Sequence, residues 1–329
     1  DGGLTPAFNL DQGWPAELIK VAPFIDPTIA NNQNVSMIER RRGGSGRLSR
    51  TSQYQFSVQR MIAGSVIEAS YVGTLSHGIT NGALVNANQL PVSALALGNL
   101  LTRNITDAAV VAAGYRVPYT GFRGTLAQAL RAFPQYQTVT TLDTPTGNNT
   151  YHGLLMKAEK RLSNGLQFLL SYAFSKSIGD ISFTNADLSR PQDQYNRRAE
   201  KSITNVDIPQ RFTASFSYEL KGMGKGVAQQ ATRGWIVAGI LSYDGGGTLR
   251  VTTPNNLPIF NGHLRPNQVA GVPIRLGGGH SEFRPLNALS GDRGDLFFNR
   301  DAFAAPAPFT LGTLGVALPN IRGFGSKGE

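Results

Sequence analysis

Residues 151–177 have the sequence YHGLLMKAEKRLSNGLQFLLSYAFSKS, and this stretch decides the fold class. Apolar and polar residues alternate with a period of two on both sides of the Asn-Gly pair at 164–165, and such alternation indicates half-buried β-strands. On the first strand, Leu154 falls on the apolar face and Lys157 on the polar face. Asn-Gly between two alternating runs is a strong hairpin signal. The stretch therefore predicts an antiparallel hairpin with one apolar and one polar face.

The same pattern occurs twice more, before and after this hairpin. Residues 51–74 alternate around a tight connection, and residues 208–243 alternate around a longer one. Each run has about ten residues, and a tilted membrane strand needs about 9–11, whereas strands in soluble proteins peak at about 5–6. Trp235 and Tyr243 lie eight residues apart on one face. At a rise of about 3.3 Å and a tilt near 45°, they are about 19 Å apart along the membrane normal, which is comparable to the spacing of two aromatic girdles.

The connections between these strands alternate in length. Outer-membrane barrels have short periplasmic turns and long extracellular loops. The predicted membrane hairpins are 51–74, 150–178 and 208–243, with short connections at 63–65, 163–165 and about 221–232. The predicted extracellular loop regions are 75–149, 179–207 and 244–329, and residues 1–50 form a loop-rich entry. Tyr136–Leu142 also has a strand pattern, but a membrane strand there would break the alternation of loop lengths, so we place it above the membrane as an extension of the outer rim.

The composition agrees with a membrane β-protein. The chain has 329 residues with 38 Gly and 18 Pro, and only 16% of its residues are charged, against about 25% in soluble domains. No run approaches the ~18 apolar residues of a membrane helix. The absence of cysteine excludes disulfides and thiolate chemistry. The basic residues that give the net charge of +10 are dispersed, and no nucleic-acid recognition motif is present. We therefore expect these residues in solvated loops or near lipid headgroups, and we expect no nucleic acid as a partner.

The two faces of the strands predict two kinds of contact. The polar face would line the lumen, where its charged residues, which we place next to short turns, pack a plug against the wall or, as an alternative, contact substrate: Lys157, Glu159, Arg161, Arg211 and Glu219. The apolar face would contact lipid or form aromatic girdles through Tyr54, Phe56, Phe168, Tyr172, Phe212, Phe216, Trp235 and Tyr243. Arg60 and Lys160 also fall on the apolar face, just before a turn, where a long side chain can extend to the headgroups.

Several segments resemble the Oar-like β-barrel region of TonB-dependent receptors. They are QYQFSVQRMIAGSVIEASYVGT, the central hairpin, DIPQRFTASFSYEL and GWIVAGILSYDGGGTLRVTTPN, and a looser similarity covers nearly the whole chain. The resemblance implies that the chain is part of a larger barrel, which has about 22 strands and a plugged lumen. It also implies a preceding signal peptide, regulatory-like domain and plug, further strands after the chain, and energy from a TonB–ExbB–ExbD system. The start at Asp1 without a signal peptide and the loop-like end at Glu329 agree with a fragment.

No residues form a catalytic or metal-binding pattern, so we expect no enzyme activity, cofactor or metal. The four histidines are far apart: His77, His152, His263 and His280. The cluster Asp292, Asp295, Asn299 and Asp301 does not have EF-hand spacing and is expected to be a turn-rich loop, with an outer-loop calcium site as the alternative. Arg40–Gly46 lacks the pattern of a P-loop and is expected to be a flexible basic loop.

The sequence supports three functions. The first is energy-coupled uptake, by a receptor in the bacterial outer membrane, of an unidentified large substrate such as an oligosaccharide or peptide. The second is an adhesion or secretion scaffold on the same barrel, and the third is a soluble carbohydrate-binding β-sandwich. A sandwich would bury its apolar faces under a second sheet. Substrate recognition is expected in the outer loops, with Tyr115, Tyr119, Phe122, Tyr195 and Asn196 as candidates.

Overall fold

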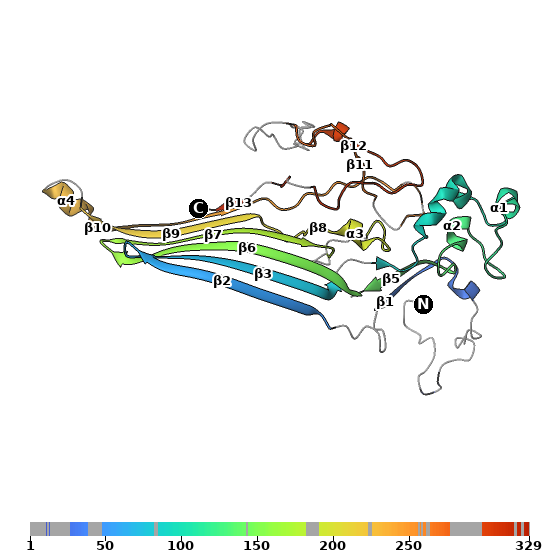
Figure 1. Ribbon diagram of the computed structural model, residues 1–329, viewed down its shortest axis with the longest axis horizontal. Helices are drawn as coiled ribbons and strands as arrows, with labels where there is room; N and C mark the ends of the chain where they lie inside the picture. Colours follow the sequence, from blue (N-terminus) through green and yellow to red (C-terminus); the bar gives the residue numbers. More distant parts are fainter. Residues whose placement is uncertain are drawn as a thin grey trace.

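The structure, a computed structural model, combines one broad sheet with a folded region at one end of it (Figure 1). It describes residues 11, 13, 27–38, 48–81, 85–142, 144–181, 191–222, 226–255, 257, 259–260, 264–276, 298–318, 321–323 and 326–328. We call the broad sheet the wall and the folded region at the end opposite the short turns the cap.

Six long strands form most of the wall. They are β2 (Arg50–Ile62), β3 (Ser65–Asn81), β6 (Thr144–Ser163), β7 (Leu166–Gly179), β9 (Gln210–Lys221) and β10 (Arg233–Asp244). Two short strands complete it: β13 (Ser326–Gly328), which pairs with β10, and β8 (Ser202–Ile203), which pairs with β7. In the described residues the order is β13-β10-β9-β7-β6-β3-β2, and all neighbours are antiparallel. The predicted all-β antiparallel fold is confirmed, and the sheet is open because β2 and β13 lie at opposite edges.

The two tightest connections have two residues each. Ala63 and Gly64 have φ values of 50° and 73°, and Asn164 and Gly165 have values of 54° and 81°. Two consecutive left-handed residues define the hairpin turn whose twist matches that of paired strands. The third connection, after β9, contains the short helix α4 (Val227–Thr232). All three connections lie at the same end of the wall, opposite the cap (Figure 1).

The strands are longer than the hydrophobic pattern predicts. Pairing of β3 with β6 continues to Asn81 and Thr144, with irregularities around Ile79. The predicted connection 75–149 was therefore too wide, because residues 144–150 of β6 have no alternation of large apolar side chains while the backbone ladder continues. Backbone pairing does not require alternation, which arises only where one face is apolar.

The long connections fold into regular structure. Outside the wall, Tyr136–Leu142 forms β5, which pairs in parallel with β1 (Gln33–Ile38) and in antiparallel with β4 (Val85–Asn86). The cap also contains η2 (Pro27–Ala30), η3 (Val92–Thr102), α1 (Ala108–Ala112), α2 (Leu126–Ala129) and α3 (Arg197–Glu200). A separate pair of strands is formed by β11 (Asn267–Gln268) and β12 (Phe303–Ala304), which follows η5 (Arg300–Ala302). None of the helices in the described part of the chain has the length and hydrophobicity needed to cross a bilayer.

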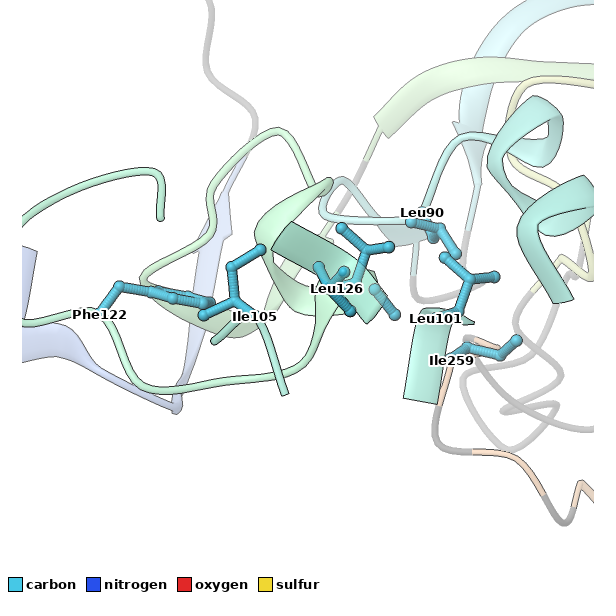
Figure 2. Close-up of a cluster of buried hydrophobic side chains, with 8 residues drawn as sticks. Leu90, Leu101, Ile105, Phe122, Leu126 and Ile259 are labelled. Carbon is cyan, nitrogen blue, oxygen red and sulfur yellow. The ribbon is translucent and has the colours of Figure 1, made fainter. Parts of the chain in front are cut away.

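The hydrophobic core lies in the cap and not in the wall. Figure 2 shows its side chains converging from η3, α2 and the segments around them, with Ile259 joining from a distant part of the chain. The members of this cluster are Leu90, Leu101, Ile105, Val110, Phe122, Leu126, Ala127 and Ile259. The expected outer loops therefore carry the main buried apolar cluster of the described residues.

The two turns provide a matched test of this geometry. Gly64→Ala and Gly165→Ala each place a side chain at a left-handed residue, which costs roughly 1–2 kcal/mol. At Gly64 the added Cβ meets nothing within 4 Å, whereas at Gly165 it lies 2.8 Å from the carbonyl oxygen of Glu219. We expect Gly165→Ala to lower the urea midpoint of the full-length protein in detergent micelles more than Gly64→Ala does. Equal midpoints would contradict the packing of this turn against β9.

Candidate membrane wall and outer cap

The register of the strands separates apolar and polar side chains onto two faces. Residues paired directly across antiparallel strands point to the same face. One row of partners is Val58, Ala69, Met156, Tyr172, Phe212 and Tyr243. The next row, on the opposite face, is Gln59, Glu68, Lys157, Ser171, Thr213 and Ser242. We call these the apolar face and the polar face.

Acidic residues are confined to the polar face. In the six long strands the carboxylates belong to Glu68, Glu159, Glu219 and Asp244, and the register places all of them on this face. The charged side chains of the apolar face are all basic and belong to Arg50, Arg60, Lys160 and Lys176. A face without carboxylates but with cations at its two ends fits a surface between two layers of anionic headgroups.

The predicted lipid-facing residues are large and mostly exposed. Phe56 is 69% exposed and Trp235 66% exposed, and Tyr54, Phe216 and Tyr243 are also exposed. Alternation along the strands places the eight candidates on the apolar face, and no described segment covers it as a second sheet would. Their contact with lipid stays a prediction.

The polar face is held by exposed ion pairs and serine hydroxyls. The Nζ of Lys157 lies 2.8 Å from Oε2 of Glu159 on the same strand. The guanidinium of Arg211 donates to both carboxylate oxygens of Asp244, at 2.6 and 3.2 Å. On β3, which lies between β6 and β2, the hydroxyl of Ser70 donates to Oε1 of Glu68 at 3.0 Å. A hollow on the polar face is lined by Lys157, Arg211, Glu68 and Ser70, together with Gln55, Ser171, Leu155 and Leu169.

The position expected for Arg211 was wrong. It is the second residue of β9, so the length of that strand separates it from the short turn that follows Lys221. It pairs with Ala173 and Asp244 in the half of the wall nearer the cap. Glu219 and Arg161 do lie near the turns, and Arg161 falls within an irregularity where β6 and β7 shift register. Whether any of these side chains contacts a plug or a substrate stays a prediction.

The candidate binding residues of the outer loops have different environments. Phe122 is only 7% exposed because it belongs to the core of the cap, so its proposed role in substrate contact was wrong. Tyr119 packs edge-on against it with ring centroids 5.4 Å apart, and its hydroxyl bonds to Asn31, while Tyr115 packs against the same cluster. Burial raises the pKa of the Tyr119 hydroxyl.

Two candidates lie in the segment before α3. Asn196 caps this helix, since its side chain accepts a hydrogen bond from the backbone N–H of Ala199 at 3.3 Å. Tyr195, in contrast, is 61% exposed. Of the five candidates, Tyr195 has the most open side chain for an external ligand.

Sequence reasoning missed a network of buried amides that joins three outer segments. The side chain of Gln192 donates to the carbonyl of Gly312 at 2.9 Å and accepts from the backbone N–H of Arg265 at 2.8 Å. Gln89 donates to Asp193 at 2.8 Å. All three of these polar side chains are buried. Isolated Gln and Asp residues in loop-like sequence give no signal that could have identified them.

Asp207 is a second buried junction. It precedes β9 and is 2% exposed. One of its oxygens accepts from the backbone N–H of Ser177 on β7, and the other lies 2.7 Å from the guanidinium of Arg322. The first residue of the DIPQR segment therefore ties a strand of the wall to the end of the chain.

A buried arginine and a half-buried one hold the cap together from within. Arg131 donates to the backbone carbonyls of Asn88 and Gln137 at 3.2 and 2.7 Å. Burial lowers the pKa of its guanidinium. Nη1 of Arg265 donates to both carboxylate oxygens of Glu200, at 2.8 and 2.9 Å. These charges serve the packing of the cap.

No metal centre occurs among the described side chains, where no group of three or more potential ligands comes together. Asn299 caps η5 by accepting from the N–H of Asp301. The other members of the proposed calcium cluster, Asp292 and Asp295, lie outside the described residues, as does Arg40–Gly46.

The family comparison identifies the class of protein. Residues 1–327 match the model of the family described as "outer membrane beta barrel domain". The chain therefore belongs to this family and is located in the outer membrane. No curated protein matches the sequence.

A solved structure of the outer membrane transporter YddB from Escherichia coli resembles this chain at 11% sequence identity and a TM-score of 0.37. The alignment covers 69% of this chain and 24% of the transporter, so the chain spans about a quarter of that protein. A likeness this low does not establish a shared function.

The amide network predicts how the cap responds to substitution. Gln192→Ala leaves buried backbone groups of Arg265 and Gly312 without partners, at a cost of roughly 1–3 kcal/mol for each group. We expect faster proteolysis in the cap of the full-length protein, while wall fragments stay protected. Tyr195→Ala, in the same segment but exposed, is the control. Equal cleavage rates for the two variants would show that the network does not hold the cap.

Proposed function

We propose that this chain is the barrel segment of a TonB-dependent transporter of the Oar-like type, which takes up a large substrate across the outer membrane. The segments that resemble the Oar-like barrel region support this, together with the composition of the polar face. That face is the observation on which the proposal mainly rests. It combines ion pairs and uncharged hydroxyl and amide groups with exposed leucine and isoleucine side chains, at Leu155, Leu169, Ile236 and Ile240. The polar groups are those expected of a lumen that contacts a polar partner and water.

The ion pairs of the polar face suit reversible contact. The side chains of Lys157 and Glu159 are about half and one-third exposed, at 48% and 38%. Exposed pairs of this kind contribute only about 0–1 kcal/mol each, so their partners can exchange at little cost. A plug that must move during each transport cycle needs such contacts, because a dry apolar interface would hold it in place.

The cap is the proposed site of substrate recognition. Its amide network fixes three outer segments relative to one another, and Tyr195 presents an exposed ring beside buried Asp193. Aromatic and amide groups of this type suit an oligosaccharide or a peptide. Outer-membrane lipid and the TonB–ExbB–ExbD system are the other proposed partners, and nucleic acid is not one.

We also propose that the chain is not an enzyme. In the described ranges no serine, threonine or tyrosine hydroxyl is hydrogen-bonded to a histidine that a third group orients, as nucleophilic catalysis requires. The Tyr71–His152 bond lies on the apolar face of the wall. The proposed roles of this chain are therefore binding and transport.

An adhesion scaffold is the alternative function. The size of the cap favours it, because a core of its own and three joined segments make a surface able to bind a macromolecule. Such a scaffold would need no coupling to TonB.

A cysteine probe distinguishes the two functions, since the chain contains no cysteine of its own. Ser171→Cys places a thiol on the polar face, where a moving plug would cover and uncover it. We expect its labelling by a small maleimide in living cells to slow several-fold when tonB is deleted or the proton-motive force is collapsed. Tyr195→Cys, in the cap, serves as the control, with an unchanged rate. A Ser171→Cys rate independent of TonB would contradict coupled transport and favour the adhesion scaffold.

A further inference from the structure

The apolar face ends in polar groups at both of its edges. On β2 the face begins with Arg50 and ends near Arg60, with tyrosine, phenylalanine and valine between them. On β6 it begins with His152 and reaches Lys160 near the turn. At about 3.3 Å rise and a tilt near 45°, the eight residues from His152 to Lys160 span about 19 Å along the membrane normal and the ten from Arg50 to Arg60 about 23 Å. These groups therefore lie near the two boundaries of an apolar band.

The edge nearer the cap has a defined arrangement of side chains. The hydroxyl of Tyr71 lies 2.7 Å from Nδ1 of His152, and the two rings stack with centroids 6.1 Å apart. Tyr54 lies 6.2 Å from Tyr71 and covers Gly73, where a Cβ would fall 2.2 Å from the ring of Tyr54. Because Gly73 has no side chain, the ring of Tyr54 can lie across β3.

Lys176 adds a positive charge to this group. It is the direct cross-strand partner of His152, so the two side chains leave the same face with Cβ atoms about 4.5–5.5 Å apart. Lys176 is exposed, and the carboxylates of the six long strands all lie on the opposite face. The ion pairs of the wall strands, Lys157–Glu159 and Arg211–Asp244, are also on that opposite face.

We propose that Lys176, His152, Tyr71 and Tyr54 form a headgroup site for a phosphate-bearing glycolipid of the outer leaflet. The ammonium of Lys176 would pair with the phosphate, and Tyr71 would orient the imidazole of His152 as a hydrogen-bonding group beside it. The ring of Tyr54 would lie against the sugar or the upper acyl chains. The complementary charge is the reason for this occupant, because cations without carboxylates at the edge of an apolar surface favour an anionic lipid. This inference rests on the outer-membrane location and does not depend on coupled uptake.

The test uses the full-length protein in a neutral detergent, with diphosphoryl lipid A as the probe and native mass spectrometry as the readout. Lys176→Gln should weaken binding about fivefold, the effect expected of one basic residue near an anionic lipid. Lipid A stripped of its phosphates should bind weakly to the parent protein and be insensitive to this substitution. Tyr71→Phe should produce a smaller loss, because it removes only the hydroxyl that orients His152.

Lys157→Gln is the matched control. It removes the same charge from the polar face, so lipid A binding should be unchanged. The proposal is overturned if Lys176→Gln and Lys157→Gln bind lipid A equally or if removal of the phosphates does not weaken binding. It is also overturned if phosphatidylglycerol binds more tightly than lipid A and depends on Lys160, since the lipid site would then belong to the inner leaflet.

Discussion

The register of the long strands is the constraint on which the rest of the structure depends. Side chains on a strand alternate with a period of two, so a slip by one residue would move every side chain of that strand to the other face. A slip of β6 would bring Lys157 and Glu159 to the apolar face, which we expect to contact lipid, and a slip of β10 would bring Asp244 there. Charged residues on the lipid face cost about 2–4 kcal/mol each at the centre of the bilayer for lysine or arginine. All carboxylates of the long strands lie on one face. The cost of moving them to the other face therefore strongly favours this register over a shifted one.

The wall and the cap are stabilised in different ways. The wall pairs its backbone groups across a continuous ladder, as any segment in a bilayer must, and leaves its apolar side chains uncovered by protein. The cap buries a cluster of leucine, isoleucine, valine and phenylalanine side chains and satisfies polar groups of its interior with side-chain amides. Asp207 connects the two regions, because it bonds to β7 in the wall and to Arg322 near the end of the chain.

The sequence predicted the wall well and the cap poorly. Alternation around the Asn-Gly turn identified the antiparallel hairpins and separated Lys157 from Met156 correctly, because both depend on residues close in sequence. The extension of β3 to Asn81 was missed, since its partner there, residues 144–150 of β6, pairs through backbone groups without an alternation of large apolar side chains. Phe122 illustrates the limit in the cap. An aromatic residue in loop-like sequence has the same pattern whether it binds a ligand or packs in a core that Ile259 joins from a distant segment.

Leu155 provides the sharpest test of the membrane assignment. The register places this leucine on the polar face, whereas its sequence neighbours Leu154 and Met156 lie on the apolar face. Spin labels at 154, 155, 156, 157, 158 and 159 of the full-length protein in lipid bilayers would report oxygen and aqueous nickel accessibility at each position. The account predicts oxygen maxima at 154, 156 and 158 and nickel maxima at 155, 157 and 159. A uniform profile, or a label at 155 that is accessible to oxygen and protected from nickel, would contradict the assignment of the apolar face to the membrane.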